Sequence, residues 1–529
     1  MKHLSFSIRR ITVLCASLAA LCAFATAARA EERLAPGEIR AEAVDEKRII
    51  PPVLIRGVKF EGVDVPANVA DAVRPFLART ATRQSLNDLA VAMNRAYAAS
   101  GVAFYSIAIP PQSFANGVVR VRVTEGAIKT ISYSGETEGR KHQMVTAYAE
   151  RLTAETTTRR ATLERTVALT RDIPGLIVEP TLHQGDAPGE VRMEMALDYQ
   201  KPTVTFGFNN RTTRLVRDGQ FSAIGKAYRL LRDGDATSLR LAASVNFKDS
   251  LQASLTHSTP IGTSGVRAEA SAAILRSNPS GTPVSGDAQL YGVAVTAPVI
   301  RSFKRNLLVR AGLDGVNSDN AAFGSLIATE RTRAARLSAT YSAGEEKLSY
   351  RLHAGVAQGI DMLGAEVTPA IGEPQYTKLT AEAGLTKHFG KSVYVRLNSG
   401  GQWTDNFLPA NERFSMGGPR FGRAFDTALV NADRGFGMSI EPAWRPISGG
   451  DFSKSEVYVF ADYVQGDVFS RSGGDTIDID MGSFGAGLRA AYDDIGVLEV
   501  EFARAYNQPV PGFDQDWRFS IGWRIDIKP

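Results

Sequence analysis

The sequence predicts a transmembrane β-barrel of about 16 antiparallel strands, preceded by two small α+β domains. From residue 200 to residue 529 apolar and polar residues alternate with a period of two, and helical periodicity is absent. Residues 53–199 instead carry twice the order strand, helix, helix, strand, strand. Beyond residue 30 no segment is apolar over the roughly 20 residues that a membrane-spanning helix needs.

The first 52 residues precede these elements. Residues 1–30 have a basic start, an apolar run from Ile11 to Phe24 and a small-residue pattern at Ala28-Arg29-Ala30, so we expect a signal peptide that is removed. Residues 31–52 contain charges and prolines without a sustained period. They indicate a linker with room for a short helix.

Removal of the signal peptide changes the composition. Both cysteines, Cys15 and Cys22, lie within it, so the fold is expected to form without disulfides. It also holds four basic residues and no acidic one, which leaves 61 − 4 = 57 basic against 56 acidic residues. A net charge of +1 gives no reason to expect a nucleic-acid partner.

The first α+β unit covers residues 53–126. A strand around Val58 is followed by a helix over Ala67–Ala78, although Pro75 weakens its second half. A second helix is predicted to begin with Ser85 as its cap and to end at Gly101. One face of this helix is apolar and contains Leu86, Leu89, Ala90, Met93 and Tyr97. Strands are expected over Phe104–Ile109 and Val118–Thr124.

The second α+β unit covers residues 127–199 and repeats this order. From periodicity alone, the two units cannot be distinguished from generic α+β domains. The expected elements are a strand over Ile128–Tyr133, helices within His142–Leu152 and Ala161–Thr170, and strands over Leu176–Leu182 and Val191–Tyr199.

The kinds of residue on the two faces of the strands favour a membrane barrel over a soluble sandwich. One face of the last strand holds large apolar residues and the other holds polar ones, as at Trp523 and Arg524. Charged residues fall on the polar face at Glu441, Arg489, Glu499 and Glu501, where a wet lumen tolerates them and a dry core does not. Sixteen strands of about 10 residues with connections of about 10 residues fill this length.

One polar stretch, Leu408–Glu441, interrupts the alternation and is rich in Gly, Arg and Asp. In a barrel such a stretch is a candidate for a loop that folds back into the lumen. Motifs for catalysis are missing: there is no phosphate-binding loop, no Gly-x-Ser-x-Gly, and no histidine pair at metal-ligand spacing. We therefore expect no enzyme activity, no cofactor and no metal.

A family resemblance rests on several motifs of the first unit. RGVKFEG at 56–62, SLNDLAVAMNRAYAASG at 85–101, the turn at Pro110-Pro111-Gln112 and NGVVRVRVTEG at 116–126 resemble the first polypeptide-transport-associated (POTRA) domain of two-partner secretion transporters. The resemblance implies that both units are POTRA-type periplasmic domains. It also implies contacts with an extended substrate, for which the candidates are Pro111, Gln112, Tyr97, Arg120 and Arg122.

The resemblance implies a site in the polar stretch as well. Gly417-Gly418 followed by Arg423 and Phe425 is similar to the family's lumen-loop tip, although Gly422 and Ala424 replace the usual Val and Gly. The family's partner strand matches Phe460-Ala461-Asp462, with Val464 in place of Gly. We expect a bidentate pair between Arg423 and Asp462. The alternative is that both are solvated lumen charges of little individual effect.

The function implied is an outer-membrane pore of a Gram-negative bacterium that captures an unfolded partner protein in the periplasm and translocates it. Its expected partners are a large secreted exoprotein of the adhesin or haemolysin type, outer-membrane lipid and the barrel-assembly machinery. The alternatives are a barrel-assembly factor of the same superfamily and a solute porin. The presence of two periplasmic units argues against the former, and the POTRA-like motifs have no purpose in the latter.

Overall fold

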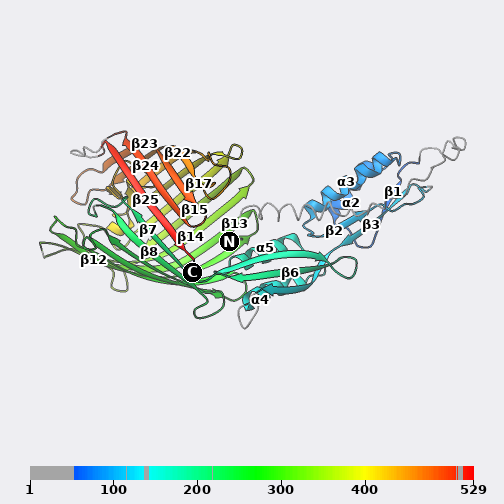
Figure 1. Ribbon diagram of the computed structural model, residues 1–529, viewed down its shortest axis with the longest axis horizontal. Helices are drawn as coiled ribbons and strands as arrows, with labels where there is room; N and C mark the ends of the chain where they lie inside the picture. Colours follow the sequence, from blue (N-terminus) through cyan, green and yellow to red (C-terminus); the bar gives the residue numbers. More distant parts are fainter. Residues whose placement is uncertain are drawn as a thin grey trace. The chain divides into compact units, whose positions relative to one another are not determined.

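The computed structural model describes residues 53–114, 116–135, 142–216, 218–323, 325–507, 509 and 516–528 (Figure 1). The predicted signal peptide and linker, residues 1–52, lie outside these ranges. The first α+β module and the barrel belong to two separate compact units. Within the described ranges, no helix combines the length and the apolar character needed to cross a membrane.

The first module is a three-stranded sheet with helices on one face. The sheet order is β1-β3-β2, so that the central strand β3 pairs parallel with β1 and antiparallel with β2. Its core joins apolar residues of α3, such as Leu89 and Met93, to alternate residues of β3, such as Val121. Its elements are β1 (Gly57–Glu61), α2 (Ala67–Val73), the 3-10 helix η2 (Arg74–Phe76), α3 (Arg83–Ser100), β2 (Tyr105–Ala108) and β3 (Val118–Glu125).

One end of each helix in this module differs from the predicted one, whereas the start at Ala67 and the end at Gly101 agree. The first α-helix ends at Val73 rather than Ala78, because Pro75 falls in a 3-10 turn. The cap of α3 is Thr82 and not Ser85, which is instead the third helical residue of a reciprocal capping box. The Thr82 hydroxyl accepts from the Ser85 N–H at 3.1 Å, and the Ser85 hydroxyl accepts from the Thr82 N–H at 2.9 Å.

The second module has the same element order and the sheet order β4-β6-β5. Its elements are β4 (Ala127–Gly135), α4 (Gln143–Thr153), α5 (Arg160–Arg171), β5 (Leu176–Gln184) and β6 (Glu190–Tyr199). Glu155 holds the start of α5: it accepts from the backbone N–H of Arg159 at 2.9 Å and from the Thr162 hydroxyl at 2.7 Å. Burial alone raises the pKa of this carboxyl, but these hydrogen bonds and the Arg159 guanidinium outweigh it and lower the pKa.

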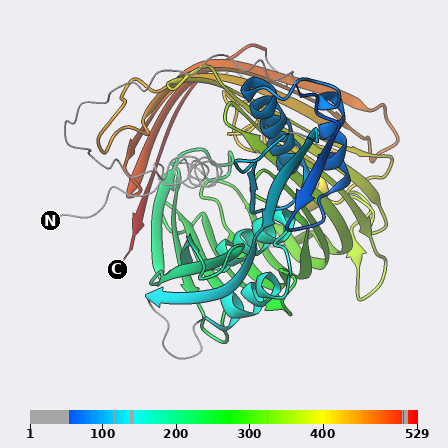
Figure 2. The same ribbon diagram turned by 90° about the vertical axis from the view of Figure 1, so that its right-hand side faces the viewer.

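The remaining strands close into one antiparallel barrel (Figure 2). Among the described residues it has sixteen long strands and one two-residue strand, β16, and the seam is closed between β25 and β7. The strands are β7 (Thr203–Asn209), β8 (Gln220–Tyr228), β9 (Ala236–Ser244), β10 (Ser250–Ile261), β11 (Val266–Ser277), β12 (Val284–Arg301), β13 (Arg305–Ala322), β14 (Ser325–Glu345), β15 (Leu348–Gly359), β16 (Glu366–Val367), β17 (Thr377–His388), β18 (Val393–Thr404), β21 (Arg434–Trp444), β22 (Glu456–Val468), β23 (Ile477–Tyr492), β24 (Gly496–Ala505) and β25 (Trp517–Ile527).

The two faces of the wall match the predicted alternation. In β22, Val457, Val459 and Tyr463 are exposed on the outer face, whereas Tyr458 and Asp462 are buried on the inner face. A closed ladder with an apolar outer face satisfies the backbone in lipid, as a membrane barrel requires. The predicted fold class, a sixteen-strand barrel behind POTRA-type domains, is confirmed.

Candidate functional site

The connection between β18 and β21, residues 405–433, folds back against the inner face of the barrel wall; we call it the lumen loop. It contains the 3-10 helix η3 (Ala410–Glu412) and a hairpin of β19 (Phe414–Met416) with β20 (Val430–Ala432). The predicted stretch Leu408–Glu441 therefore extends too far. Residues 434–441 lie on β21, in which buried and exposed residues alternate, as at Gly437 and Met438. Glu441 is therefore a residue of the barrel wall.

The tip of the lumen loop depends on three glycines with positive φ. Gly417, Gly418 and Gly422 have φ values of +92°, +101° and +75°. A Cβ atom on Gly417 would lie 2.3 Å from the carbonyl oxygen of Asp426 across the tip. The glycine pair is therefore a steric requirement of this turn.

The lumen loop is attached to the wall first by an apolar cluster. Phe421, Ala424 and Phe425 of the tip are buried against Tyr458 and Phe460 of β22. Each buried aromatic side chain contributes about 1.5–3 kcal/mol of transfer free energy. On this side the lumen is therefore filled by packed apolar side chains. The alternation along single strands did not reveal this packing.

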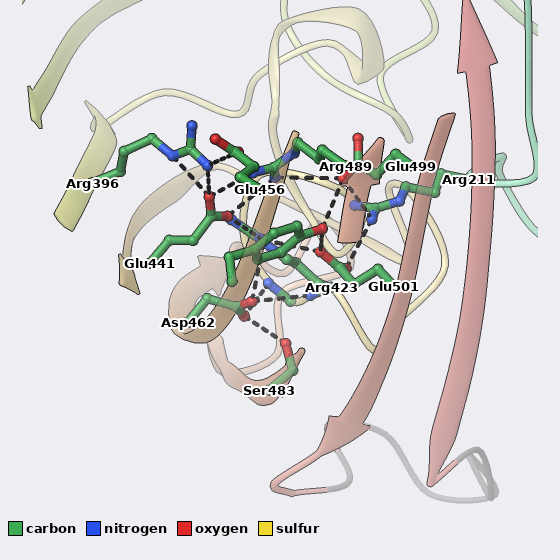
Figure 3. A network of polar contacts seen from close by, with 12 residues as sticks. Arg211, Arg396, Arg423, Glu441, Glu456, Asp462, Ser483, Arg489, Glu499 and Glu501 are labelled. Carbon is green, nitrogen blue, oxygen red and sulfur yellow. Dashed lines mark hydrogen bonds and ion pairs between the residues drawn. The ribbon is translucent and has the colours of Figure 1, made fainter. Parts of the chain in front are cut away.

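Asp462 binds the backbone of the tip (Figure 3). One of its carboxylate oxygens accepts from the Gly422 N–H at 2.6 Å and from the Ser483 hydroxyl at 2.7 Å. The other accepts from the Arg423 N–H at 3.4 Å. Glycine at position 422 gives the tip the positive φ at the point where its N–H meets this carboxylate.

The predicted bidentate pair between Arg423 and Asp462 is not formed. The nearest approach of the guanidinium to Asp462 is 3.9 Å, from Nε. Its Nη1 atom lies instead between Glu441 at 2.8 Å and Glu501 at 3.1 Å. The guanidinium also stacks 4.4 Å from the centre of the Phe460 ring, and the side chain is 7% exposed. The alternative of solvated lumen charges is therefore also wrong for these residues.

Arg423 is one member of a network of charges that joins the lumen loop to strands β18, β21, β22, β23 and β24 and to the segment after β7. Figure 3 shows most of its members. Arg489 bridges Glu441 at 2.8 Å and Glu456 at 2.7 Å, and the Tyr458 hydroxyl donates to Glu501 at 2.8 Å. Among the described residues, five carboxylates and five guanidiniums balance in this network. They are Glu441, Glu456, Asp462, Glu499 and Glu501 with Arg211, Arg396, Arg423, Arg445 and Arg489.

The stem of the lumen loop has ionic attachments of its own. Glu412 pairs with Arg336 at 2.6 Å and with Lys378 at 2.7 Å, on strands β14 and β17. Buried Asp433 pairs with Arg471 at 2.6 Å. The loop is therefore fixed at its tip and at both ends of its stem. Sequence reasoning missed Arg336, Lys378 and Arg471, because nothing local to them marks which carboxylate they meet.

Tyr97 and Gln112, two predicted substrate contacts, have structural roles in the first module. The Tyr97 side chain is fully buried and its hydroxyl donates to Glu125 at 3.1 Å. Burial and the Glu125 carboxylate raise the pKa of this hydroxyl. The Gln112 side chain donates to the Arg120 carbonyl and accepts from the Arg120 N–H, both at 2.7 Å. Because Tyr97 is fully buried, the expectation that it touches substrate is wrong; Gln112 is partly exposed, and its contact with a substrate stays a prediction.

Pro111, Arg120 and Arg122 are exposed. Arg120 pairs in register with Lys59 of β1, so that basic side chains from two strands stand side by side on the open face of the sheet. Their contact with a substrate stays a prediction.

Comparisons with known proteins agree with this architecture. The family model described as haemolysin secretion/activation protein ShlB/FhaC/HecB matches residues 196–490, and the ShlB-type POTRA domain matches residues 53–126. A search of curated protein sequences gave no match.

Solved structures share the fold. CdiB from Escherichia coli is 16% identical with a TM-score of 0.72, covering 99% of this chain and 100% of that one. CdiB from Acinetobacter baumannii is 16% identical with a TM-score of 0.64, covering 100% of both chains. BamA from Haemophilus ducreyi lacking POTRA domains 1–3 is 11% identical with a TM-score of 0.51, covering 89% of this chain and 99% of that one. Since the family model covers more than half of the sequence, the chain belongs to the haemolysin secretion/activation family.

Proposed function

We propose that this outer-membrane transporter of the two-partner secretion type exports one large, unfolded exoprotein of the adhesin or haemolysin type, and that the lumen loop must leave the wall for the exoprotein to pass. Membership of the family implies a secreted protein as partner. The observation that carries the proposal is the folded loop inside the barrel, attached by the apolar cluster and the balanced charge network.

The charge balance supports a reversible displacement. When the loop leaves with Arg423, the wall keeps five carboxylates and four guanidiniums, a net charge of 5 − 4 = 1 negative unit. Glu441 keeps Arg489 and Glu501 keeps Arg211 at 2.9 Å, whereas Asp462 keeps the hydrogen bond from the Ser483 hydroxyl at 2.7 Å. The vacated wall is therefore not severely strained, yet it attracts the loop back after passage.

Recognition is proposed to take place on the first module. Its edge strands β1 and β2 can each accept an extended chain by backbone pairing. The exposed basic side chains of Lys59, Arg120 and Arg122 favour a segment with acidic residues. In this scheme folding of the exoprotein outside the cell gives the transport its direction, and the transporter acts without catalysis. Insertion into the lipid of the outer membrane by the barrel-assembly machinery is part of the same proposal.

The experiment compares Arg423→Ala with Arg420→Ala in cells that lack the native gene. Arg420 lies on the same tip, but its ion pair with Glu382 is exposed, with side chains 50% and 47% accessible, and pairs of this kind contribute about 0–1 kcal/mol. We expect Arg423→Ala to reduce the amount of exported exoprotein while heat-modifiable barrel remains in the membrane. Arg420→Ala should export normally.

Three results would refute the proposal. One is an unchanged surface level of the exoprotein after deletion of the transporter gene. Another is a general loss of outer-membrane barrels after the deletion, which would identify an assembly factor instead. The third is a loss of small-solute uptake alone, which would identify a porin.

A further inference from the structure

The closing seam of the barrel is short. Strands β25 and β7 are joined by a ladder from Gly522↔Asn209 to Ile527↔Val204. Strand β25 begins five residues before Gly522, at Trp517, whereas β7 ends at Asn209. The seam between the first and the last strand therefore needs other contacts at this end.

Asn210, the residue after β7, provides the first of them. Its side-chain oxygen accepts from the Ile521 N–H at 2.9 Å, and its side-chain nitrogen donates to the Phe519 carbonyl at 3.1 Å. Its own N–H donates to the Ile521 carbonyl at 3.1 Å. One side chain thus continues the pairing along β25 where the strand ladder has stopped.

The tip of the lumen loop reaches both sides of this junction. Asp426 accepts from Arg518 of β25 at 2.5 Å, and Arg518 is only 9% exposed. Thr427 donates its N–H to the Thr212 carbonyl at 3.2 Å and its hydroxyl to the Arg211 carbonyl at 3.1 Å. Two consecutive loop residues therefore hold the last strand and the continuation of the first.

The charge network adds a third link. The Arg211 guanidinium extends from the segment after β7 to Glu501 of β24 at 2.9 Å (Figure 3). The same carboxylate binds Arg423 of the loop at 3.1 Å through its other oxygen. Glu501 thus connects the loop tip and the segment after β7 through one buried group.

We propose that the tip of the lumen loop is a clasp on the closing seam, so that departure of the loop loosens the contact between β25 and residues 209–212. The inference rests on the proposed function, in which the loop leaves the wall during export. It adds that the barrel becomes deformable at the seam only while the loop is displaced, so the moment of passage is also the moment at which the lumen can widen.

The test measures backbone amide exchange by mass spectrometry on the full-length protein in lipid nanodiscs. Asp426→Asn removes the charge facing Arg518 and keeps the shape of the side chain. We expect amides of β25 to exchange about fivefold faster, the effect of losing one pair of this kind. Amides of β15, on a distant part of the ladder, should be unchanged.

A second experiment measures the coupling in the opposite direction, from the seam to the loop, and leaves the loop sequence unchanged. Coupling between two sites acts in both directions, so locking the seam should slow exchange in the loop hairpin, residues 414–432. A Cβ atom on Gly522 lies 3.4 Å from that of Asn209, which suits a disulfide in Asn209→Cys/Gly522→Cys. The matched control is Gly344→Cys/Ser349→Cys, with a corresponding distance of 3.8 Å between β14 and β15. Outside residues 1–30 the chain has no other cysteine to interfere.

Each outcome decides the inference. Faster exchange in β25 of Asp426→Asn together with slower loop exchange in the seam-locked variant alone supports the clasp. Unchanged exchange in either arm, or equal effects of the two disulfides, overturns it. If Asp426→Asn fails to insert, the disulfide arm decides. Export of the exoprotein is assayed separately. If the exchange experiments show coupling between loop and seam but no exoprotein is exported, only the proposed function is refuted. If the exoprotein is exported but the exchange experiments show no coupling, only the clasp is refuted.

Discussion

Replacement of Asp462 by asparagine should leave the lumen loop nearly in place, whereas replacement by alanine should release it. The reason is that the carboxylate binds the loop backbone rather than the guanidinium. The Gly422 N–H and the Ser483 hydroxyl both donate to the same oxygen, at 2.6 and 2.7 Å. An asparagine oxygen in that position keeps both bonds. An Asp462–Arg423 ion pair, by contrast, would be lost equally in both variants.

The magnitudes follow from these contacts. In Asp462→Asn the amide nitrogen replaces the second carboxylate oxygen, which accepts from the Arg423 N–H at 3.4 Å, so that weak hydrogen bond is lost. The remaining oxygen is also a neutral acceptor in place of a charged one. Together these two changes should weaken the attachment of the loop by about 1 kcal/mol. In Asp462→Ala the buried Gly422 N–H and Ser483 hydroxyl both lose their acceptor, at about 1–3 kcal/mol each. Taking about 3 kcal/mol in total, loop release should increase about fivefold in the first variant and more than about a hundredfold in the second.

The assay is maleimide labelling of a cysteine at Met416, which is fully buried in the loop hairpin and becomes accessible only when the loop leaves. Met416→Cys alone is the reference background, and Arg420→Ala is the control for a change in tip charge. Labelling of Asp462→Asn as fast as that of Asp462→Ala would refute the reasoning and restore the guanidinium pair as the function of this carboxylate.

Three further results are expected. Gly417→Ala should increase the rate of maleimide labelling at Met416→Cys by at least about tenfold, because φ is +92° and the new Cβ atom has no space. Gly225→Ala on β8, where a Cβ atom meets nothing within 4 Å, is the control and should not change the rate. Gln112→Ala should destabilise the first module by about 1–2 kcal/mol in proteolysis of the intact protein, since both Arg120 backbone groups lose a partner at 2.7 Å; unchanged proteolysis would contradict this role. The lowered pKa of Glu155 contributes stability that is complete above the ordinary carboxyl value of about 4.3 and is lost as the pH falls through the lowered value. The protection factors of α5 amides, which are corrected for the intrinsic pH dependence of exchange, should therefore fall at acidic pH in the wild type, and Glu155→Gln should abolish that fall.

Local sequence was sufficient for features set by one segment at a time. The alternation in β22 placed Tyr458 and Asp462 on one shared face, because side chains of a strand point to opposite faces in turn, and the structure shows that this is the buried inner face. The end of α3 at Gly101 was predicted from a glycine that follows the last periodic residue, whereas the pair Gly417-Gly418 was singled out by the family resemblance; all three have the positive φ that glycine permits. The helix cap at Thr82 was missed because Thr82 and Ser85 both qualify as caps by type.

The ion pairs could not be predicted in the same way. Arg423 meets Glu441 and Glu501, 18 and 78 residues away along the chain, and these distances depend on the register of several strands and on how the tip packs. A resemblance supplied the right loop and the right carboxylate, Asp462, but the wrong bond between them. Backbone binding by Asp462 is invisible in a motif that lists side chains.

The sequence by itself determined the sixteen-strand barrel, its two preceding modules, the alternating faces of the strands and the presence of a polar stretch, predicted as Leu408–Glu441. Each of these follows from the period of side chains along one segment, which the chain carries locally. The tertiary structure alone decided which charges are neighbours and where the barrel closes. The contact of Arg518 with Asn210 joins residues 308 positions apart, and that of Asp426 with Arg518 joins residues 92 apart. Such contacts arise only when the whole ladder has closed, since each depends on the register of every strand between them.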